Sequence, residues 1–380
     1  MALSWNIRLK RRSWFRFVLP TIVLGLLCYC TWAYCHKLCY QQINGQFGHR
    51  SVAIGLICVV CFLDVVVIFI WLQMVVWIGP GKQPHVAPFL ILPVASKEET
   101  NDGGSQSTSA EYDAVIPPKC YQSDPHGYPI WCSPCQSLKT ERTHHSSELG
   151  HCVPRFDHYC MWAGTVIGRD NYRLFVQFVA YFSILLLIMW ASICVYTKEI
   201  TQRHHSQGPR INVNVMLTLA FAILGWLLTT STLGSAIFYM SQNKTSLEAI
   251  MDSKRKKFGT RKIFSYYSES NKLRFVVEFD RSEFHAFWSK KTILANVKDF
   301  MGPNMLMWLI PLGKPFILSS KTDEVDNSLP SGQRVTLTEI LGPYEELYSD
   351  YTIQAIEDKI AKGNYLTTFR AFGDDASSVH

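Results

Sequence analysis

The residues of this chain that could do chemistry concentrate in one polar stretch, residues 131–171. That stretch holds four of the twelve cysteines together with four histidines. Cys132 and Cys135 are spaced as the two thiolates of a zinc knuckle. The remaining ligands must come from nearby imidazole and thiol groups, namely His144, His145, His151 and Cys152. A segment so poor in apolar residues needs a metal to hold a shape, which argues against an unligated loop.

The same stretch carries a candidate nucleophile in the run Asp157-His158-Tyr159-Cys160. A free thiol is only a few per cent thiolate at neutral pH, so Cys160 needs a base, and His158 lies two residues before it. Asp157 can hold that imidazole in its useful tautomer. The alternatives are a structural or zinc-bound thiol for Cys160, a loop-capping role for His158 and a turn residue for Asp157.

Four long apolar runs surround this stretch, and each is long enough to cross a hydrocarbon core of about 30 Å. They are Phe17–Cys35, Val52–Ile78, Leu174–Tyr196 and Val213–Met240. The first run is too long for a signal peptide's apolar region and is expected to stay as a helix. Asp64 is the only charge in the second run, and we expect it to be hydrogen-bonded to Asn214 or Thr218.

The basic residues indicate which way the chain crosses the membrane. Five of them precede the first span, between Arg8 and Arg16, and Lys254–Lys257 follow the last. The positive-inside bias therefore puts both termini and the loop 79–173 in the cytosol. In that reducing compartment, zinc binding or catalysis is favoured over disulfides. The net charge of +7 reflects these flanks and does not indicate nucleic acid. A reactive thiol at a membrane face points to lipid or thioester chemistry.

The sequence predicts an all-α integral membrane protein with four transmembrane helices and a cytosolic zinc-binding domain between helices two and three. The expected division is a cytosolic N-terminus (1–16), helices one and two with a short lumenal loop (17–78), a linker (79–116), a cysteine-rich zinc domain (117–171), helices three and four (172–240), a cytosolic C-terminal element (241–320) and a polar tail (321–380). A helix is expected in the tail at Tyr351–Lys362.

The cysteine-rich stretch resembles the corresponding domain of the DHHC family of protein S-acyltransferases, in the variant with a Tyr that occurs in a fungal branch. The residues that match its spacing are Cys132, Cys135, Lys139, Arg142, His144, His145, Cys152, Asp157, His158, Cys160, Trp162, Gly168 and Asn171. Gly79-Pro80-Gly81, Thr245-Ser246-Leu247-Glu248 and Asn296 with its aromatic neighbours resemble further motifs of the family. The resemblance covers roughly residues 14–312.

The resemblance implies one complete zinc site, formed by Cys132, Cys135, His145 and Cys152. Family members usually hold a second zinc, whose ligands would fall at Ser146, Leu149, Tyr159 and Val166. None of these four residues is a family ligand, so we expect one zinc per chain. Leu149, Tyr159 and Val166 are expected to form a small apolar plug instead.

The resemblance also implies the reaction: transfer of a palmitoyl group from acyl-CoA to cysteines of membrane-associated proteins, through acyl-Cys160. His158 would be the base and Asp157 its partner. Trp162 would pack beside the acyl chain, and Lys139 and Arg142 would contact the CoA phosphates. The expected location is a multi-pass membrane protein, endomembrane (ER or Golgi) or plasma membrane, with a cytosolic active site. The sequence does not indicate whether an accessory subunit is required.

Two other classes compete with the acyltransferase. A catalytically degenerate membrane scaffold with a one-zinc interaction module would explain the missing second site, although Asp157, His158 and Cys160 are all retained. A transporter gated by the zinc module has little support, since the spans carry one charge and no visible repeat. Acylation of Cys160 separates the enzyme from the scaffold.

Overall fold

The computed structural model describes residues 2–89, 115–204, 212–259, 261–280, 286–313 and 335–370. The expected linker beyond residue 89 and parts of the polar tail lie outside these ranges. The chain divides into two compact units. Unit 1 comprises Met1–Pro80, His158–Ser241 and Ile293–Pro315, and unit 2 comprises Gly81–Asp157, Gln242–Thr292 and Phe316–His380.

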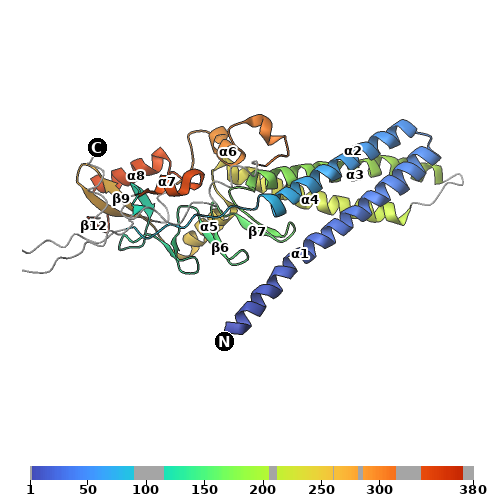
Figure 1. Cartoon of the computed structure of the whole chain (residues 1–380). Helices are drawn as coiled ribbons and strands as arrows, with labels where there is room; N and C mark the ends of the chain where they lie inside the picture. Colours follow the sequence, from blue (N-terminus) through green and yellow to red (C-terminus); the bar gives the residue numbers. More distant parts are fainter. Residues whose placement is uncertain are drawn as a thin grey trace, which may run out of the picture. The chain divides into compact units, whose positions relative to one another are not determined.

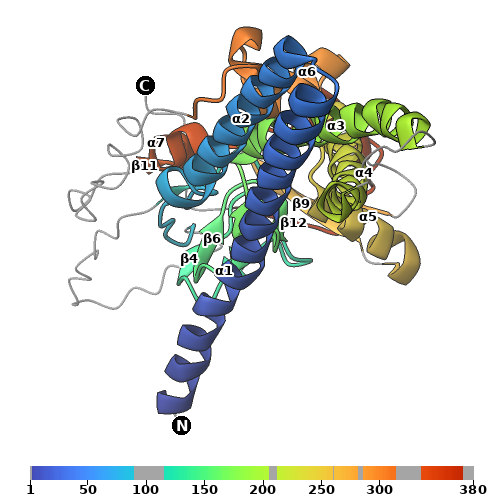
Figure 2. The same cartoon turned by 90° about the vertical axis from the view of Figure 1, so that its right-hand side faces the viewer.

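Unit 1 is built on four long helices, which Figures 1 and 2 show lying side by side. Their bounds are α1 (Ala2–Trp32), continued by the π-helical η1 (Ala33–Gln46); α2 (Arg50–Leu72), continued by η2 (Gln73–Trp77); α3 (Tyr172–His204); and α4 (Val213–Ser241). Each contains a stretch long and apolar enough to cross a membrane. The four predicted spans are confirmed, and the first continues further than expected, to Gln46. The helix stop after the second span is also confirmed, because Gly79 adopts a positive φ of 65°.

Hydrogen bonds between polar side chains connect the spans. The Tyr34 hydroxyl lies 2.7 Å from that of Ser192, which joins η1 to α3. The Thr31 hydroxyl donates to Asp64 at 2.8 Å, which joins α1 to α2. The expected hydrogen bond of Asp64 to a polar residue is confirmed, but its partner is Thr31, and Asn214 instead accepts a hydrogen bond from the Tyr29 hydroxyl. Such pairs hold helices together where apolar surface alone gives no driving force.

Two short pieces complete unit 1. A hairpin of β7 (His158–Cys160) and β8 (Thr165–Ile167) leads directly into α3. After the last span come α6 (Ile293–Met301) and the 3₁₀ turn η3 (Met305–Trp308). The Asn296 amide donates to the carbonyl of Ser241, the last residue of α4, at 2.8 Å. This bond satisfies a carbonyl at the end of α4 and links α6 to that helix.

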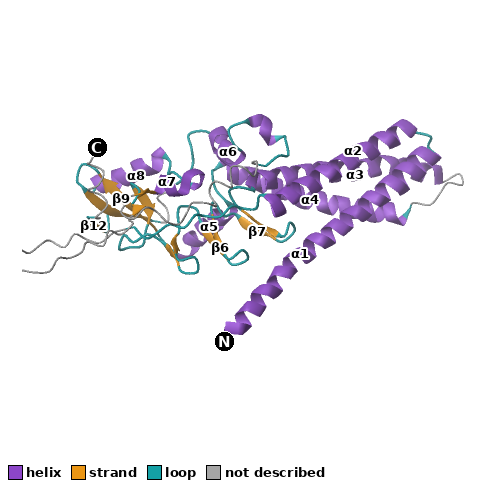
Figure 3. Ribbon diagram, in the orientation of Figure 1, coloured by secondary structure: helices purple, strands orange, loops and turns teal. Residues whose placement is uncertain are grey.

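Unit 2 is rich in strands, as Figure 3 shows. Its elements are β1 (Val115–Ile116), β2 (Cys120–Gln122), β3 (Trp131–Cys132), β4 (Ser137–Leu138), β5 (His144–Ser146), β6 (His151–Val153), α5 (Ser246–Phe258), β9 (Lys262–Ser268), β10 (Leu273–Phe279), β11 (Val335–Thr336), α7 (Leu337–Leu341), the 3₁₀ turn η5 (Gly342–Tyr344), α8 (Asp350–Ala361) and β12 (Thr367–Phe369). The four-stranded antiparallel sheet has the order β12-β10-β9-β2. An aromatic core forms on β9 and β10, where Phe264 and Phe279 pack with Ile356 of α8.

The expectation of an all-α protein was wrong. The apolar runs gave a strong signal for helices, whereas the strands of unit 2 are mostly two or three residues long and too short to show a period-two pattern. The helix expected in the tail is present as α8.

Candidate active site and metal centre

Two small hairpins in unit 2 bring four metal-ligating side chains together. Cys132 and Cys135 come from the β3–β4 hairpin, and His145 and Cys152 are directly paired across β5 and β6. All four ligand atoms lie within 4.8 Å of one another. The Nδ1 atom of His145 lies 3.5 Å from the Cys132 Sγ and 3.2 Å from the Cys135 Sγ.

These separations suit a tetrahedral zinc ion. Zinc–sulfur bonds of about 2.3 Å and zinc–nitrogen bonds of about 2.0 Å hold neighbouring ligand atoms roughly 3.5 to 4 Å apart. Burial and the charge of Lys139 lower the pKa of His145, so its ring is neutral at pH 7, the form that binds a metal. Among the described residues, this is the one group of at least three Cys, His, Asp or Glu side chains close enough to share an ion.

Gln83 holds the two metal hairpins in place, a role that its sequence position did not suggest. Its backbone N–H donates to the Cys152 carbonyl at 3.0 Å. Its side-chain amide donates to the Leu138 carbonyl at 2.7 Å and accepts from the Thr140 backbone at 3.1 Å. One buried residue thus forms hydrogen bonds to both hairpins. A single Gln after a helix stop is common in sequences, so this role could not be predicted.

The four positions of the family's second zinc site, Ser146, Leu149, Tyr159 and Val166, also lie on short β-hairpins. In unit 2, the Ser146 hydroxyl accepts the Leu149 N–H at 3.3 Å and closes the β5–β6 turn. In unit 1, Tyr159 and Val166 are direct partners across β7 and β8. Cross-strand apolar pairs stabilise a hairpin, so Tyr159 and Val166 can support the hairpin where the family has metal ligands.

The β7–β8 hairpin decides which way the candidate nucleophile faces. Successive side chains of a strand point to opposite faces, so His158 and Cys160 share one face of β7 while Tyr159 lies on the other. Cys160 is half-buried and packs against the apolar cluster at the start of α3, which includes Phe175. The His158 ring packs edge-on against the Phe175 ring, with 5.2 Å between the ring centroids. The imidazole and the thiol can therefore reach the same substrate.

Three contacts fix this hairpin against the helices of unit 1. The Trp71 indole donates to the Ala163 carbonyl at 3.0 Å. Asn171, which is fully buried, donates to the Val166 carbonyl at 2.9 Å and accepts the Gly168 N–H at 2.9 Å. Gly164 has a φ of 73° and approaches α1 so closely that a Cβ would lie 2.8 Å from the Arg16 carbonyl. The motif residue Asn171 is thus a structural support of the hairpin.

An apolar pocket lies beside the turn that follows Cys160. Trp162 of that turn contributes one wall. The other walls come from α1, α2 and α3 and are lined by Pro20, Val23, Leu24, Leu27, Val67, Ile68, Trp71, Phe178 and Phe182. The pocket has a volume of about 40 Å³, so it can hold a short part of an apolar chain but not a whole palmitoyl group.

In unit 2, Asp157 is bound by the Thr245–Glu248 motif at the start of α5. Its carboxylate accepts the Ser246 N–H at 2.6 Å, and its carbonyl accepts the Ser246 hydroxyl at 3.2 Å. Asp157 is 5% exposed. The sequence placed this motif and the Asp157 run about ninety residues apart, and only the fold brings them together.

Arg142 is used inside unit 2. Its guanidinium donates twice to the Glu248 carboxylate at 2.8 Å and twice to Asn243, to the side-chain oxygen at 3.0 Å and to the backbone carbonyl at 3.2 Å. Its side chain is 1% exposed. Burial would raise the pKa of Glu248, but the Arg142 charge and its hydrogen bonds outweigh burial and hold that pKa below the ordinary value. Because these donors are taken, Arg142 is better explained as a support of α5 than as a ligand of CoA.

Lys139 lines a cavity of about 680 Å³ in unit 2. Six basic and three acidic side chains border it; the basic ones are Lys139, Arg142, Lys244, Lys254, Arg261 and Lys262. The Lys262 ammonium lies 4.2 Å from the Phe287 ring centroid, and Trp288 lines the same wall. Positive charge beside aromatic rings suits a phosphorylated nucleotide.

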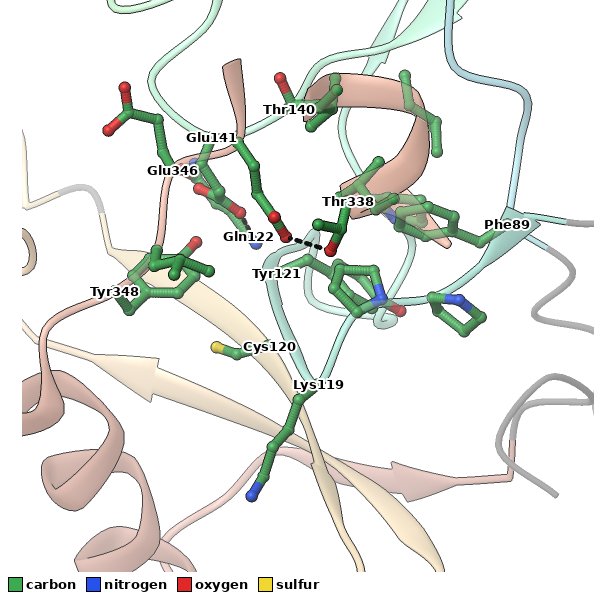
Figure 4. A pocket seen from close by; sticks show the side chains of 18 of the residues that line it. Phe89, Lys119, Cys120, Tyr121, Gln122, Thr140, Glu141, Thr338, Glu346 and Tyr348 are labelled. Carbon is green, nitrogen blue, oxygen red and sulfur yellow. Dashed lines mark hydrogen bonds between the residues drawn. The ribbon is translucent and has the colours of Figure 1, made fainter. Parts of the chain in front are cut away.

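A second cavity of unit 2, of about 510 Å³, is shown in Figure 4. Cys120, Glu141 and Tyr348 line it together with Phe89 and Tyr121. The Glu141 carboxylate accepts the Gln122 N–H at 2.7 Å, and burial raises its pKa above the ordinary range. Burial likewise raises the pKa of the Cys120 thiol, which makes it a poor nucleophile.

Comparison with known proteins gives a consistent result. The sequence profile of the DHHC palmitoyltransferase family matches residues 126–253. The chain is 74% identical to palmitoyltransferase PFA5 of Saccharomyces cerevisiae over the full length of both chains. It is 45% identical to palmitoyltransferase PFA5 of Candida glabrata over 98% of each chain. It is 27% identical to palmitoyltransferase ZDHHC15 of Xenopus laevis over 66% of this chain and 71% of that one.

Proposed function

Since the chain belongs to the DHHC palmitoyltransferase family and is a multi-pass protein S-palmitoyltransferase, we propose that Cys160 is the nucleophile that carries the acyl group. The observation that carries this proposal is the β7–β8 hairpin. It gives His158 and Cys160 a common face and sets Trp162, two residues later, beside an apolar pocket between three spans. A thiol, an imidazole and a site for an acyl chain then meet within one short segment.

The reaction has two steps. In the first, His158 takes the thiol proton and the Cys160 sulfur attacks the carbonyl carbon of acyl-CoA. The bond from that carbon to the CoA sulfur breaks, and CoA leaves with the proton as a free thiol. In the second, His158 takes the proton of a substrate protein's thiol, and that sulfur attacks the acyl-Cys160 carbonyl. The bond from the carbonyl carbon to the Cys160 sulfur breaks, and this sulfur receives the proton from His158. One thioester replaces another at each step, so neither step requires an energy source.

Asp157 is the proposed partner that keeps His158 in its basic tautomer. Two observations support a fixed position for this carboxylate: its burial and its 2.6 Å hydrogen bond from the Ser246 N–H. A carboxylate held in this way loses little orientational entropy when it acts on the imidazole.

The proposed seat of the CoA nucleotide is the basic cavity lined by Lys139. Lys254 and Lys262 are its further phosphate partners, and Trp288 supplies a ring for stacking. This assignment replaces Arg142, whose donors are occupied by Glu248 and Asn243. The acyl chain itself is proposed to lie among the apolar side chains of the spans.

Zinc is the proposed structural metal, with one ion held by Cys132, Cys135, His145 and Cys152. Three thiolates and one imidazole form a closed site with no open position, which is typical of structural rather than catalytic zinc. Its role would be to stabilise the short hairpins of unit 2, which bury too little apolar surface to be stable alone.

The proposed orientation puts unit 2 and the active site in the cytosol of an endomembrane or plasma membrane. The proposed substrates are proteins with cysteines close to that membrane. The basic residues around the first and last spans support this orientation.

The test is incubation of the purified full chain with alkyne-tagged palmitoyl-CoA. Wild type should gain a label that hydroxylamine removes, and Cys160→Ser should gain none. Cys194→Ser is the matched control, because Cys194 is an exposed thiol of α3 outside the site. A label that persists in Cys160→Ser would refute the assignment. No label on wild type that carries zinc would favour the scaffold.

A further inference from the structure

The segment 305–313, which follows α6 in unit 1, combines exposed apolar side chains with hydrogen-bonded backbone carbonyls. Leu306 is 71% and Leu309 is 70% exposed. Met305, Ile310 and Leu312 are exposed as well. A water-facing loop with this composition would be unusual, since exposed loops are polar and let water satisfy their carbonyls.

Every carbonyl from Leu306 to Leu312 accepts a hydrogen bond from the protein. The side-chain nitrogen of Gln177 lies 2.9 to 3.0 Å from the carbonyls of Met307, Trp308 and Ile310, and its two hydrogens are shared among them. The Ile310 carbonyl also accepts the Leu312 N–H at 2.8 Å. The Leu306 carbonyl accepts the N–H groups of Leu309 and Ile310 at 3.2 and 3.3 Å.

The other three carbonyls are met by side chains of the second and third spans. The Tyr181 hydroxyl donates to Leu309 at 2.6 Å, Gln73 donates to Pro311 at 2.7 Å, and Arg173 donates to Leu312 at 2.5 Å. Gln73 also accepts the Gly313 N–H at 2.9 Å. Seven consecutive carbonyls of a largely non-helical segment are thus satisfied without water.

The donors on α3 lie along one stripe of a membrane-spanning helix. Arg173, Gln177 and Tyr181 follow each other at intervals of four residues, so they share one helix face. They extend over eight residues, which is about 12 Å of helix. The segment therefore lies along the first turns of the third span, and its last part, Leu312, lies beside Arg173 at the start of that span.

We propose that the segment 305–313 is immersed in the lipid bilayer, with Leu306 and Leu309 among the acyl chains. Non-helical backbone is tolerated at membrane depth only when protein groups satisfy it, and this segment meets that condition. Its exposed side chains continue the apolar surface that the spans present to lipid. Trp308 packs inward against the apolar cluster that includes Cys160, so the immersed segment supports the wall behind the nucleophile.

The experiment places a fluorescent noncanonical residue at position 309 of the full chain in liposomes. Brominated phosphatidylcholine serves as the quencher in lipid and iodide as the quencher in water. The probe at Leu228, an exposed residue of α4, gives the lipid reference, and the probe at Leu347, an exposed residue of unit 2, gives the aqueous reference. The proposal predicts bromolipid quenching at 309 equal to that at 228, with no iodide quenching.

Iodide quenching at 309 like that at 347 would overturn the proposal. Protection from both quenchers would overturn it too, because it would mean that protein covers the segment. Gln177→Met tests the cause: it removes the donor to three carbonyls, so iodide quenching at 309 should rise several-fold. Tyr181→Phe, which removes one donor, should give a smaller rise. No change in either variant would show that the bonded backbone is not what keeps the segment in lipid.

Discussion

At the residue scale, the structure gives the buried Arg142 a different role from the one that the sequence suggested. The family resemblance implied that Arg142 contacts a CoA phosphate, but its guanidinium is enclosed by Glu248, Asn243 and the Trp288 ring, whose centroid lies 5.2 Å away. Spacing reports where a residue lies along the chain. It does not report whether a carboxylate about a hundred residues away has already taken its donors.

The first prediction concerns this ion pair. Arg142→Met leaves the Glu248 carboxylate buried without its partner, and we expect a loss of about 3 kcal/mol of unfolding free energy. The measurement is the melting temperature of the purified protein. Arg261→Met is the control, because its ion pair with Glu278 is on an exposed side chain and should matter little. Equal shifts in the two variants would argue against the buried pair as a major support.

The second prediction is the pH dependence of the same pair. The folded-state pKa of Glu248 lies below its ordinary value of 4.5, so the unfolded chain binds the proton more tightly. The stability that the ionised Glu248 contributes is therefore complete above the ordinary pKa and is lost as pH falls through the folded pKa. We expect the melting-temperature advantage of wild type over Glu248→Gln to be constant from pH 7 to about 5 and to shrink below that. An advantage that grows in acid would contradict this sign.

At the element scale, hairpins carry both the metal centre and the nucleophile. The two hairpins of unit 2 supply paired ligands, whereas the β7–β8 hairpin of unit 1 carries Tyr159 and Val166 where family ligands would stand. The same local structure can therefore be held by a metal or by cross-strand side chains. This difference leads to two predictions.

The third prediction is that Gly164→Ala disrupts the catalytic hairpin. The new Cβ would lie 2.8 Å from both the Arg16 carbonyl and the Pro20 ring, in addition to the strain at a φ of 73°. We expect loss of acyl-enzyme formation and a lower melting temperature. Gly48→Ala has the same strain, at a φ of 74°, but open space around it. Its cost should be about 1 kcal/mol with activity retained. Normal activity of Gly164→Ala would show that the hairpin tolerates a shift.

The fourth prediction is the metal content. Elemental analysis of the purified protein should find one zinc per chain, and two would refute the single-site assignment. Cys152→Ser should lose the zinc, whereas Cys120→Ser, a change outside the ligand set, should keep it. Removal of zinc by a strong chelator should expose unit 2 to proteolysis, because binding energy of a structural zinc is also folding energy.

At the scale of the whole molecule, the order of the spans decides where unit 2 lies. Its segments enter the chain after the second and the fourth span. With all four candidate helices crossing, an even number of crossings precedes each segment of unit 2. We therefore propose that these segments lie on the same side of the membrane as the N-terminus.

The fifth prediction follows from that connectivity and from the basic flanks. In sealed vesicles with the cytosolic face outward, trypsin should cleave unit 2 at exposed sites such as Arg261 and leave the four spans protected. In vesicles of the opposite orientation, unit 2 should be protected until detergent is added. Cleavage of unit 2 only in this second preparation would reverse the orientation.

The sequence alone determined what depends on residue type and local spacing. Four apolar runs predict four spans because a hydrocarbon core demands length and low charge. The interval between Cys132 and Cys135 predicted a zinc knuckle, and the family resemblance implied His145 and Cys152 as its other ligands. The structure brings these four side chains together. The pair His158 and Cys160 is also local, because alternation along one strand sets its common face.

Only the tertiary structure decided the long-range partners. Asp157 meets Ser246, Arg142 meets Glu248, and Arg155 forms a bidentate pair with Glu346 across 191 positions. The three donors on α3 satisfy the carbonyls of a segment about 130 residues later. Such pairs form only when the fold brings distant segments together, and many other polar residues of the chain could have formed the same hydrogen bonds. The local sequence pattern does not predict these partners, because tertiary packing decides which residues meet.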